Sequence, residues 1–527
     1  MVAPIGGYCG LIQNLDAATY CQISNYFTGM QIINHEKKSN KALVGIISIA
    51  VIIYSLRYLF SLSFGLVPDE AYYWDWTRSL SLGYFDHPPL VAWLGWVGCH
   101  LFGNTIAGVR FGAFAGSLIA VVASILLARN YLKTSSSLLM LLLVFNAAII
   151  CSVGLLLLTP DVPLIAFWAL ALWQVYRAVY NQSRSAWVLM GIFGGLGMLS
   201  KYTFVLFFVA LGVFLLADSK ARRFWFSPWL WLSGLISLLI FSVNLFWNSQ
   251  HQWISFGFQI KHGLSAQKLV DWNFLGEYIG GQIGVLSIFL FVILIIAIVF
   301  ACKKSFRDSS KNLLVVFTVV PLCFFAASSL RNHVEPNWPA MAYISGFILI
   351  GWLFDIAVVN RRKFLRWFIV SAVVIGLIAS TGLLVHIVRP WLPMPPGNDV
   401  TLQMKGWKTF AKSVDSSLIA FDPGRRYPLC ANGYPEAALL SFYMPEQPQV
   451  VALNLGVRDN NYSFLSITKK IKGDTLLFID RTENGILPAG RVPYFSGLQI
   501  FDTLLLTKIP GLSVEYGLFK GVLQKAD

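Results

Sequence analysis

Apolar segments recur along most of this 527-residue chain, and they restrict its fold more than any other feature. A helix needs about 20 apolar residues to cross roughly 30 Å of membrane hydrocarbon. Apolar runs near this length lie at 42–64, 106–128, 136–158, 162–180, 186–200, 202–217, 229–247, 284–301, 312–330, 340–357 and 367–388. The sequence therefore predicts a mainly α-helical polytopic membrane protein with about 11 to 13 transmembrane helices.

Composition and charge placement agree with a membrane protein. Hydrophobic residues make up 56% of the chain and charged residues only 12%, whereas soluble proteins carry roughly 25% charged residues. The net charge of +15 could indicate a nucleic-acid partner. However, the basic residues gather in alternate loops between the apolar runs, as the positive-inside rule requires. We therefore expect a cytoplasmic N-terminus, contact with membrane lipids and no nucleic-acid partner.

The membrane part is preceded by a short segment and interrupted early by a large outer loop. Residues 1–41 are expected to be a cytoplasmic N-terminal segment. Its first 29 residues are either an upstream extension or a disordered stretch, or else an ordered amphipathic segment. Residues 42–389 would form the transmembrane domain. Its first outer loop, 65–104, should contain interfacial helices, because the run 88–102 is short and begins with two prolines.

Beyond a proline-rich linker the character of the chain changes. Residues 390–527 mix polar stretches with β-rich segments. These predict a small C-terminal α/β domain on the outer, periplasmic face. We expect one helix at 402–413, followed by strands at 417–421, 449–453, 475–479 and 499–505.

The first outer loop holds a dense cluster of acids and aromatics. It reads Asp69-Glu70-Ala71-Tyr72-Tyr73-Trp74-Asp75-Trp76 and then Gly83-Tyr84-Phe85-Asp86-His87-Pro88-Pro89-Leu90. Ionisable residues at a membrane are costly and usually functional. A plainer alternative is that Asp69 and Glu70, which follow Pro68, favour the start of a helix. Asp86 could likewise cap the helix that follows it.

Polar residues also follow three later apolar runs on the expected outer side. Asp161 follows Thr159-Pro160, where it could be an ordinary turn residue. Lys201 lies between two apolar runs, where a lysine either extends to the interface or pairs with an anion. Its position runs against the charge bias of the loops, which favours a bound phosphate. The compact loop Arg331–Pro339 offers an arginine able to grip a phosphate through two hydrogen bonds.

These motifs together resemble one family. Asp-Glu-Ala-Tyr-Tyr-Trp, Gly-Tyr-Phe-Asp-His-Pro-Pro-Leu, Val109-Arg110 and the Arg331-x-x-x-x-Pro-Asn-Trp-Pro pattern are similar to those of the bacterial polyprenyl-phosphate-sugar glycosyltransferases. That membrane family is related to protein O-mannosyltransferases and to the lipid A aminoarabinose transferase. The resemblance implies the GT-C fold and a place in the bacterial inner membrane. It also implies transfer of a sugar from a polyprenyl (undecaprenyl) phosphate carrier to lipid A or lipopolysaccharide, another glycolipid or a protein on the periplasmic face.

The resemblance also assigns roles to residues. It implies Asp69 and Asp161 as catalytic acids, and Lys201, Arg331 and His87 as ligands of the donor phosphate. Glu70, Tyr73, His333, Glu335 and Asn337 would bind substrate, and Asp86 would hold a divalent metal, if one is used. Aminoarabinose transferases carry a lysine at the position of His87, so a fixed charge there is in doubt at neutral pH.

Two other functions remain open from the sequence. A translocator (flippase) of lipid-linked sugars could use the same acids as proton relays, although transporter sites usually lie at the bilayer midplane. A polymerase or ligase acting on diphosphate-linked glycans is the other. The chain contains neither a Walker nucleotide-binding motif nor a Rossmann fingerprint, which disfavours ATP-driven transport and a nucleotide-sugar donor.

Overall fold

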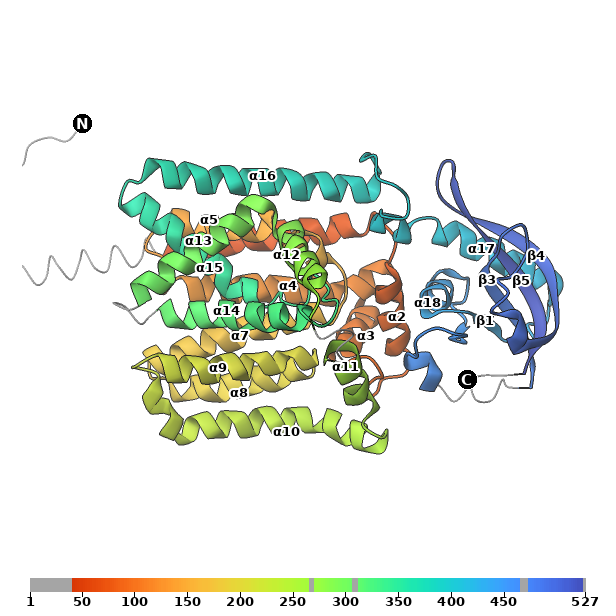
Figure 1. Ribbon diagram of the computed structural model, residues 1–527, viewed down its shortest axis with the longest axis horizontal. Helices are drawn as coiled ribbons and strands as arrows, with labels where there is room; N and C mark the ends of the chain where they lie inside the picture. The colour runs from red at the N-terminus through yellow and green to blue at the C-terminus, as the bar shows by residue number, and fades with distance from the viewer. Residues whose placement is uncertain (1–39, 265–269, 306–310, 465–472, 525–527) are drawn as a thin grey trace, which may run out of the picture.

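A computed structural model shows a bundle of long helices joined at one end to a mixed α/β region (Figure 1). The structure describes residues 40–264, 270–305, 311–464 and 473–524. The expectations for the N-terminal segment therefore lie almost wholly outside the described residues. The polar end of the bundle, where α2, α3 and α11 lie, faces the α/β region in Figure 1.

Seven helices among the described residues are long and apolar enough to cross a membrane. They are the first helix (Asn40–Ser61), α4 (Ile106–Ala128), α7 (Asp161–Tyr180), α10 (Pro228–Gln250), α14 (Asn312–Ser329), α15 (Ala342–Val359) and α16 (Lys363–Val388). The total rises to nine if each of two bent pairs forms one span. One pair is α5 (Ser135–Ala147) with α6 (Ile149–Ser152) and η1 (Gly154–Leu156), bent by 79°; the other is α12 (Trp272–Leu286) with α13 (Ile288–Ser305), bent by 103°.

This number is lower than the 11 to 13 spans expected, for a physical reason. The runs 186–200 and 202–217 became α8 (Arg184–Met198) and α9 (Val205–Ala217), the latter preceded by the short η2 (Tyr202–Phe204). The 15 residues of α8 extend only about 22 Å at 1.5 Å per residue, short of a ~30 Å hydrocarbon layer. Both helices nevertheless belong to the bundle, because α8 packs against α7 and α10, and α9 packs against α14 (Figure 1).

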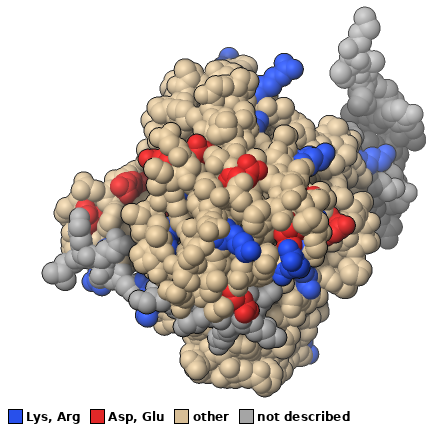
Figure 2. Space-filling view, turned by 90° about the vertical axis from the view of Figure 1, so that its right-hand side faces the viewer, with Lys and Arg blue, Asp and Glu red and all other residues tan. Residues whose placement is uncertain are grey.

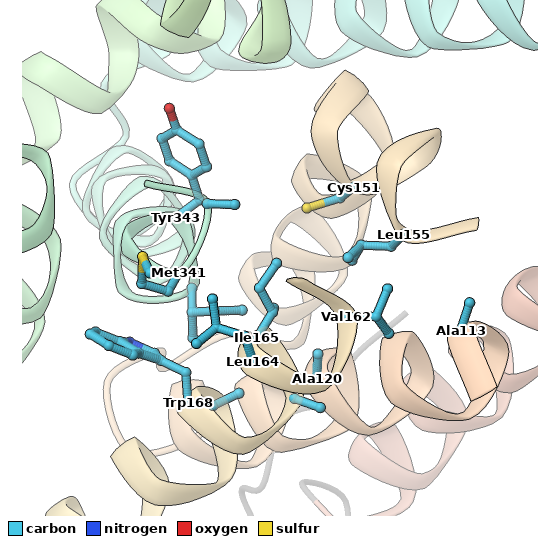
Figure 3. Close-up of a cluster of buried hydrophobic side chains, with 14 of the residues drawn as sticks. Ala113, Ala120, Cys151, Leu155, Val162, Leu164, Ile165, Trp168, Met341 and Tyr343 are labelled. Atoms are coloured by element: carbon cyan, nitrogen blue, oxygen red, sulfur yellow. The ribbon is translucent and has the colours of Figure 1, made fainter. Parts of the chain in front are cut away.

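The bundle is held by an apolar core in which small residues allow close helix approach. In Figure 3, Ala113 and Ala120 of α4 lie beside Val162, Ile165 and other residues of α7. Trp168, fully buried, fills the space next to Met341 at the start of α15. At Gly116 of α4 an added Cβ would come within 2.6 Å of the Val162 side chain. Such small-residue contacts drive helix association where lipid offers no hydrophobic gain.

The first outer loop folds into two helices at the end of the bundle. These are α2 (Pro68–Thr77) and α3 (Leu90–Phe102). Proline at the first position of α2 needs no hydrogen-bonded N–H there, which explains the start. The 13-residue α3 is too short to span and matches the interfacial helix expected at 88–102. From Glu70 to Thr77, every residue of α2 is buried, because the helix lies between the bundle and the C-terminal region.

The C-terminal region is a five-stranded mixed sheet with helices packed on it. The strands are β1 (Leu429–Ala431), β2 (Val451–Ala452), β3 (Thr475–Arg481), β4 (Phe495–Ile509) and β5 (Leu512–Leu523), in the order β2-β1-β3-β5-β4. Strand β1 pairs in parallel with β2 and β3, while β5 pairs antiparallel with β3 and β4. The helices are α17 (Trp407–Phe421) and α18 (Tyr434–Tyr443), with α18 against α2. Seen from this end, acidic and basic side chains are scattered over a largely uncharged surface (Figure 2).

The strand expected at 417–421 is wrong, because these residues end α17. The buried side chains Trp407, Phe410, Ala411, Val414 and Leu418 recur at three- and four-residue spacing. That period is typical of an amphipathic helix, and it continues through the residues assigned to a strand.

Candidate active site

A cavity of about 710 Å³ lies where the end of the bundle that carries α2 and α3 meets the C-terminal region. Its lining combines charged, aromatic and aliphatic side chains from parts of the sequence that lie far apart. The polar lining residues include Asp69, Tyr72, Tyr73, Asp86, His87, Asp161, Lys201, Glu335, Asn337, Tyr434, Arg458 and Asn460. Eight of the site residues predicted from the sequence, Asp86 included, therefore line this one cavity.

Asp69 stands at the start of α2 with its side chain accessible from the cavity. The Tyr434 hydroxyl donates a hydrogen bond to Asp69 Oδ1 at 2.9 Å. The protein packed around the cavity shields this carboxyl from bulk water and raises its pKa, while the hydrogen bond from Tyr434 and the charge of Arg458 act in the opposite direction. A carboxylate with a raised pKa, reachable from a cavity, suits the role of general base.

Asp86 is buried and is held by two side chains. The Tyr72 hydroxyl donates to Asp86 Oδ2 at 2.5 Å, and Arg458 Nη2 lies 3.4 Å from Oδ1. Burial raises the pKa of Asp86 to about 6 despite both contacts. The alternative of a helix cap does not hold, because α3 begins after Pro89 and has no side-chain cap.

Asp161 and Lys201 form an ion pair on the opposite wall. Lys201 Nζ lies 2.7 Å from Asp161 Oδ1, and the two side chains are only 11% and 12% exposed. Asn337 Nδ2 donates to the other oxygen, Oδ2, at 2.7 Å. Asp161 opens α7, and Lys201 ends the turn after α8. With both its oxygens engaged, Asp161 is arranged to orient Lys201 and Asn337 rather than to accept a further proton.

Tyr73 and His87 also line the cavity. Their rings lie 6.1 Å apart, centroid to centroid. Burial, together with the nearby charges of Asp69 and Asp86, raises the pKa of Tyr73 well above 10. Its phenol therefore stays protonated and can donate a hydrogen bond at neutral pH.

The other half of the cavity is apolar. Met198 of α8, Val205 and Leu206 of α9, and Phe324 and Phe325 of α14 form this wall. Val205 is 48% exposed and Phe324 is 39% exposed, so this wall reaches the lateral surface of the bundle at α9 and α14. One continuous space thus joins charged groups to an apolar surface.

The structure does not bring Glu70 to the cavity, although it follows Asp69 directly. Glu70 is fully buried and takes two hydrogen bonds from the equally buried Arg110, at 2.8 and 2.6 Å. Its oxygens also accept the backbone N–H groups of Val67 and Leu158. Successive helix positions point about 100° apart, so one acid faces the cavity and the next faces the bundle. Glu70 therefore fixes α2 to the bundle and is not placed to bind substrate.

The loop 331–339 reaches the cavity only through its second half. Glu335 and Asn337 are lining residues, whereas Arg331 and His333 are not. Arg331 is exposed, and His333 lies at the surface near Glu277 and Glu335, at 3.0 and 3.5 Å. In this structure Arg331 is therefore not placed to bind a phosphate in the cavity, and His333 is not placed to bind substrate there.

The contacts of Asp86 do not fit a divalent cation. Its two oxygens face a phenol and a guanidinium, and the positive charge of Arg458 at 3.4 Å would repel a metal ion. Among the described residues, no group of three or more His, Cys, Asp or Glu side chains could hold a metal. Metal dependence remains a prediction that these contacts do not support.

Sequence reasoning missed the lining residues that the C-terminal region supplies. Tyr434, Arg458 and Asn460 all line the cavity, and none was predicted as a site residue. Tyr434 lies 365 positions from its partner Asp69, and Arg458 lies 372 positions from Asp86. The one available signal was an arginine within the polar stretch Gly456–Asn461, next to several hydrogen-bonding residues.

Solved structures of known proteins share this arrangement of helices and sheet. The fold superposes on the crystal structure of ArnT from Cupriavidus metallidurans with a TM-score of 0.63 at 14% identity, covering 90% of this chain and 98% of that one. ArnT bound to undecaprenyl phosphate gives a TM-score of 0.61, also at 14% identity, over 90% of this chain and 97% of that one. The fold is therefore that of ArnT: a mainly helical, multi-pass integral membrane protein with a C-terminal mixed sheet.

Sequence comparison shows which protein family part of the chain is similar to. Residues 86–247 match the family described as Dolichyl-phosphate-mannose-protein mannosyltransferase. This part of the chain is similar to that family, which agrees with the family resemblance and the fold class expected from its motifs.

Curated relatives cover part of the chain. It is 27% identical over 302 residues to the Lipid A galacturonosyltransferase RgtD of Rhizobium johnstonii, covering 54% of this chain and 60% of that protein. It is 23% identical over 381 residues to the Undecaprenyl phosphate-alpha-4-amino-4-deoxy-L-arabinose arabinosyl transferase of Erwinia tasmaniensis, covering 64% of each. The chain thus spans somewhat less than two thirds of the length of these relatives.

Proposed function

We propose that this protein transfers a sugar from a polyprenyl phosphate, such as undecaprenyl phosphate, to an acceptor at the outer face of the membrane. The observation that carries the proposal is the cavity itself. It joins an apolar wall, which reaches the lateral surface of the bundle at α9 and α14, to a lysine and several carboxylates at the bundle end. A lipid phosphate-sugar has the same sequence of parts: an apolar chain, a phosphate and a polar sugar.

Asp69 is proposed to act as the general base. In a single displacement, the acceptor oxygen attacks the anomeric carbon while the bond from that carbon to the phosphate oxygen breaks. The acceptor proton passes to Asp69, and the lipid phosphate leaves with the bonding electron pair. The configuration at the anomeric carbon is inverted. The raised pKa of Asp69 supports this role, because a base with a pKa nearer to neutrality takes a proton more effectively.

Lys201 is proposed to neutralise the leaving phosphate. It lies beside the apolar wall, only four residues before Val205 in the chain, and Asp161 and Asn337 hold it in place. Neutralising the charge that develops on a leaving group is among the largest contributions that an active site makes. His87 and Tyr73 line the same cavity and can add hydrogen bonds to the phosphate or sugar.

The acceptor is proposed to be lipid A or a related glycolipid. RgtD is named for transfer to lipid A, and ArnT has been crystallised with undecaprenyl phosphate. The positive-inside bias of the loops supports a cytoplasmic start of the chain and a cavity on the periplasmic side. A carrier lipid can present its sugar on that side, where nucleotide sugars are absent.

Transfer from purified lipid donors tests this function directly. Vesicles containing the full chain, a radiolabelled polyprenyl-phosphate sugar and lipid A should yield labelled lipid A, and a vesicle with Asp69→Asn should not. Arg331→Ala, at an exposed position outside the cavity, is the matched control and should retain activity. If the label only changes leaflet and never leaves the carrier, the protein is a translocator. Transfer from a diphosphate-linked donor alone would also overturn the proposal.

A further inference from the structure

Arg458 is a cation of the cavity that comes from the C-terminal region rather than the bundle. It lies in the loop between β2 and η6 (Asn461–Phe464). That loop is attached to the first outer loop by several contacts. Asn461 N–H donates to the Tyr72 hydroxyl at 2.7 Å, Asn461 Oδ1 accepts from Phe85 N–H at 3.3 Å, and the rings of Phe85 and Phe464 stack 5.1 Å apart. The guanidinium is thus held over the cavity by fixed neighbours.

The guanidinium of Arg458 is held in place, but its ion pair with Asp86 is weak. Its contact with Asp86 is long, at 3.4 Å, and its side chain is 52% exposed. It lies over the ring of Phe258 of α11 (Ile254–Leu264), 4.7 Å from the centroid, which holds its plane. A guanidinium offers five N–H donors in a rigid fork that matches carboxylate and phosphate groups. Most of these donors remain available to a ligand.

The order of groups along the cavity indicates which part of a substrate Arg458 meets. The apolar wall on α9 and α14 adjoins Lys201. Arg458 instead neighbours Asp69, Asp86 and Tyr434. If the carrier phosphate lies at Lys201, the reacting carbon lies near Asp69, and Arg458 lies beyond it on the outer side. A guanidinium there meets the transferred sugar or the acceptor, and not the carrier phosphate.

We propose that Arg458 is a specificity-determining residue that binds an anionic group on the outer side of the reacting centre. This inference rests on the function proposed above. The anion is a carboxylate of the transferred sugar, as in a uronic acid, or a phosphate of the acceptor. Both present coplanar oxygen pairs to the guanidinium fork. Asp86 is the acidic partner of Arg458 in this structure, and the anion competes with it for the guanidinium.

The test pairs two donors with two acceptors in vesicles of phosphatidylethanolamine and phosphatidylglycerol containing the full chain. The donors are polyprenyl-phosphate galacturonic acid and its neutral counterpart, polyprenyl-phosphate galactose. The acceptors are lipid A with its phosphates and enzymatically dephosphorylated lipid A. Arg458→Gln should raise KM by roughly tenfold to a hundredfold for the substrate that carries the anion, as expected for a charged hydrogen bond, and leave its neutral counterpart unchanged. Arg458→Lys should restore part of the affinity.

The four combinations of donor and acceptor distinguish a carboxylate of the donor sugar from a phosphate of the acceptor. They also define the results that would contradict the proposal. A KM effect that follows the donor carboxylate identifies the sugar, and one that follows the acceptor phosphates identifies the acceptor. Equal losses in all four combinations overturn the proposal, as does a loss confined to kcat. Arg426→Ala is the matched control, because Arg426 is exposed in the same region and forms an ion pair with the nearby Asp422, outside the cavity lining; it should change none of these values.

A binding measurement, which does not require sugar transfer, distinguishes failure of the anion site at Arg458 from failure of the proposed transferase function. Quenching of tryptophan fluorescence by the galacturonic acid donor and, separately, by phosphorylated lipid A measures affinity even when no sugar moves. If the wild type binds at least one of them more tightly than Arg458→Gln does, the anion site stands even where transfer fails. If it binds neither more tightly, the anion site is overturned, whatever the transfer assay shows.

Discussion

Tyr434 of α18 donates a hydrogen bond of 2.9 Å to Asp69 at the start of α2, joining two residues 365 positions apart. The contact places a side chain of the C-terminal region directly on the proposed base. It favours the ionised carboxylate and so works against the rise in the pKa of Asp69 that its surroundings cause.

Removing that hydrogen bond should shift the pH dependence of transfer. In Tyr434→Phe the carboxylate loses a stabilising donor, so the pKa of Asp69 rises further. Because the base must be ionised, activity falls as pH drops through its pKa, and in the variant this fall should begin at a higher pH. Profiles of kcat/KM against pH for the two proteins measure the shift. An acidic limb that stays in place would show that Asp69 does not control the rate.

Asp69→Asn should lower kcat by about 10² to 10⁴, the usual contribution of a positioned base. The amide has nearly the same shape but cannot take the proton. Donor binding should change little, which a fluorescence titration with polyprenyl-phosphate sugar can measure. Comparable expression and melting temperature are the required controls. Wild-type rates in this variant would assign Asp69 to helix initiation alone.

Asp86 should give the protein a distinct pH response. Its pKa is raised to about 6 by burial, so the folded state holds a proton that the unfolded chain has already released. The contribution of this group to stability therefore falls as pH rises from about 4 to about 6 and is constant above that. Thermal unfolding in detergent at several pH values should show this component in the wild type, and it should be missing in Asp86→Asn. Parallel curves for the two proteins would contradict the shift.

Breaking the Glu70–Arg110 pair should destabilise the protein without a specific effect on chemistry. Neither side chain is exposed, so Glu70→Ala leaves a buried guanidinium without its counter-charge. Loss of one partner of a buried ion pair costs about 3–5 kcal/mol. Thermal unfolding of the detergent-solubilised protein, monitored by size-exclusion chromatography, should show the loss of stability. A variant with normal melting and no transfer would instead return Glu70 to the list of substrate ligands.

Asp161→Asn should weaken donor binding through Lys201. Without its counter-charge the ammonium is no longer held at 2.7 Å in the cavity wall. We expect a rise in donor KM of roughly tenfold, the scale of a charged hydrogen bond, with Lys201→Met giving a similar rise. The double variant should be little worse than either single one, because the two residues act as a unit. Fully additive effects would mean that Asp161 contributes to the reaction independently of Lys201.

Local rules predicted much of this architecture. The proline before Asp69 indicated where α2 starts, and the short apolar run after Pro89 indicated that α3 is too short to span. Neighbouring helix residues point about 100° apart, which explains why Asp69 and Glu70 have different surroundings. The role of Glu70 did not follow, because it depends on Arg110, which is 40 residues away and reached only through packing of α2 on α4.

Long-range contacts account for the remaining misses. Tyr434 and Arg458 carry no motif, and an aromatic residue or an arginine in a mixed α/β region is usually structural or solvated. Their positions in the cavity follow from the docking of α18 and the 456–461 loop against the outer end of the bundle. Among the described residues, fewer helices than expected are long and apolar enough to count as candidate spans, since an apolar run shows that a segment is buried but not whether it is long or straight enough to span.

The shared cavity has a consequence for how such proteins diversify. The groups proposed to bind the carrier lie on helices of the bundle, while Tyr434 and Arg458 come from a region that follows all of those helices in the chain. With the proposed roles, mutation or recombination within the last quarter of the gene would alter which sugar or acceptor is accepted and leave the groups that hold the lipid carrier intact.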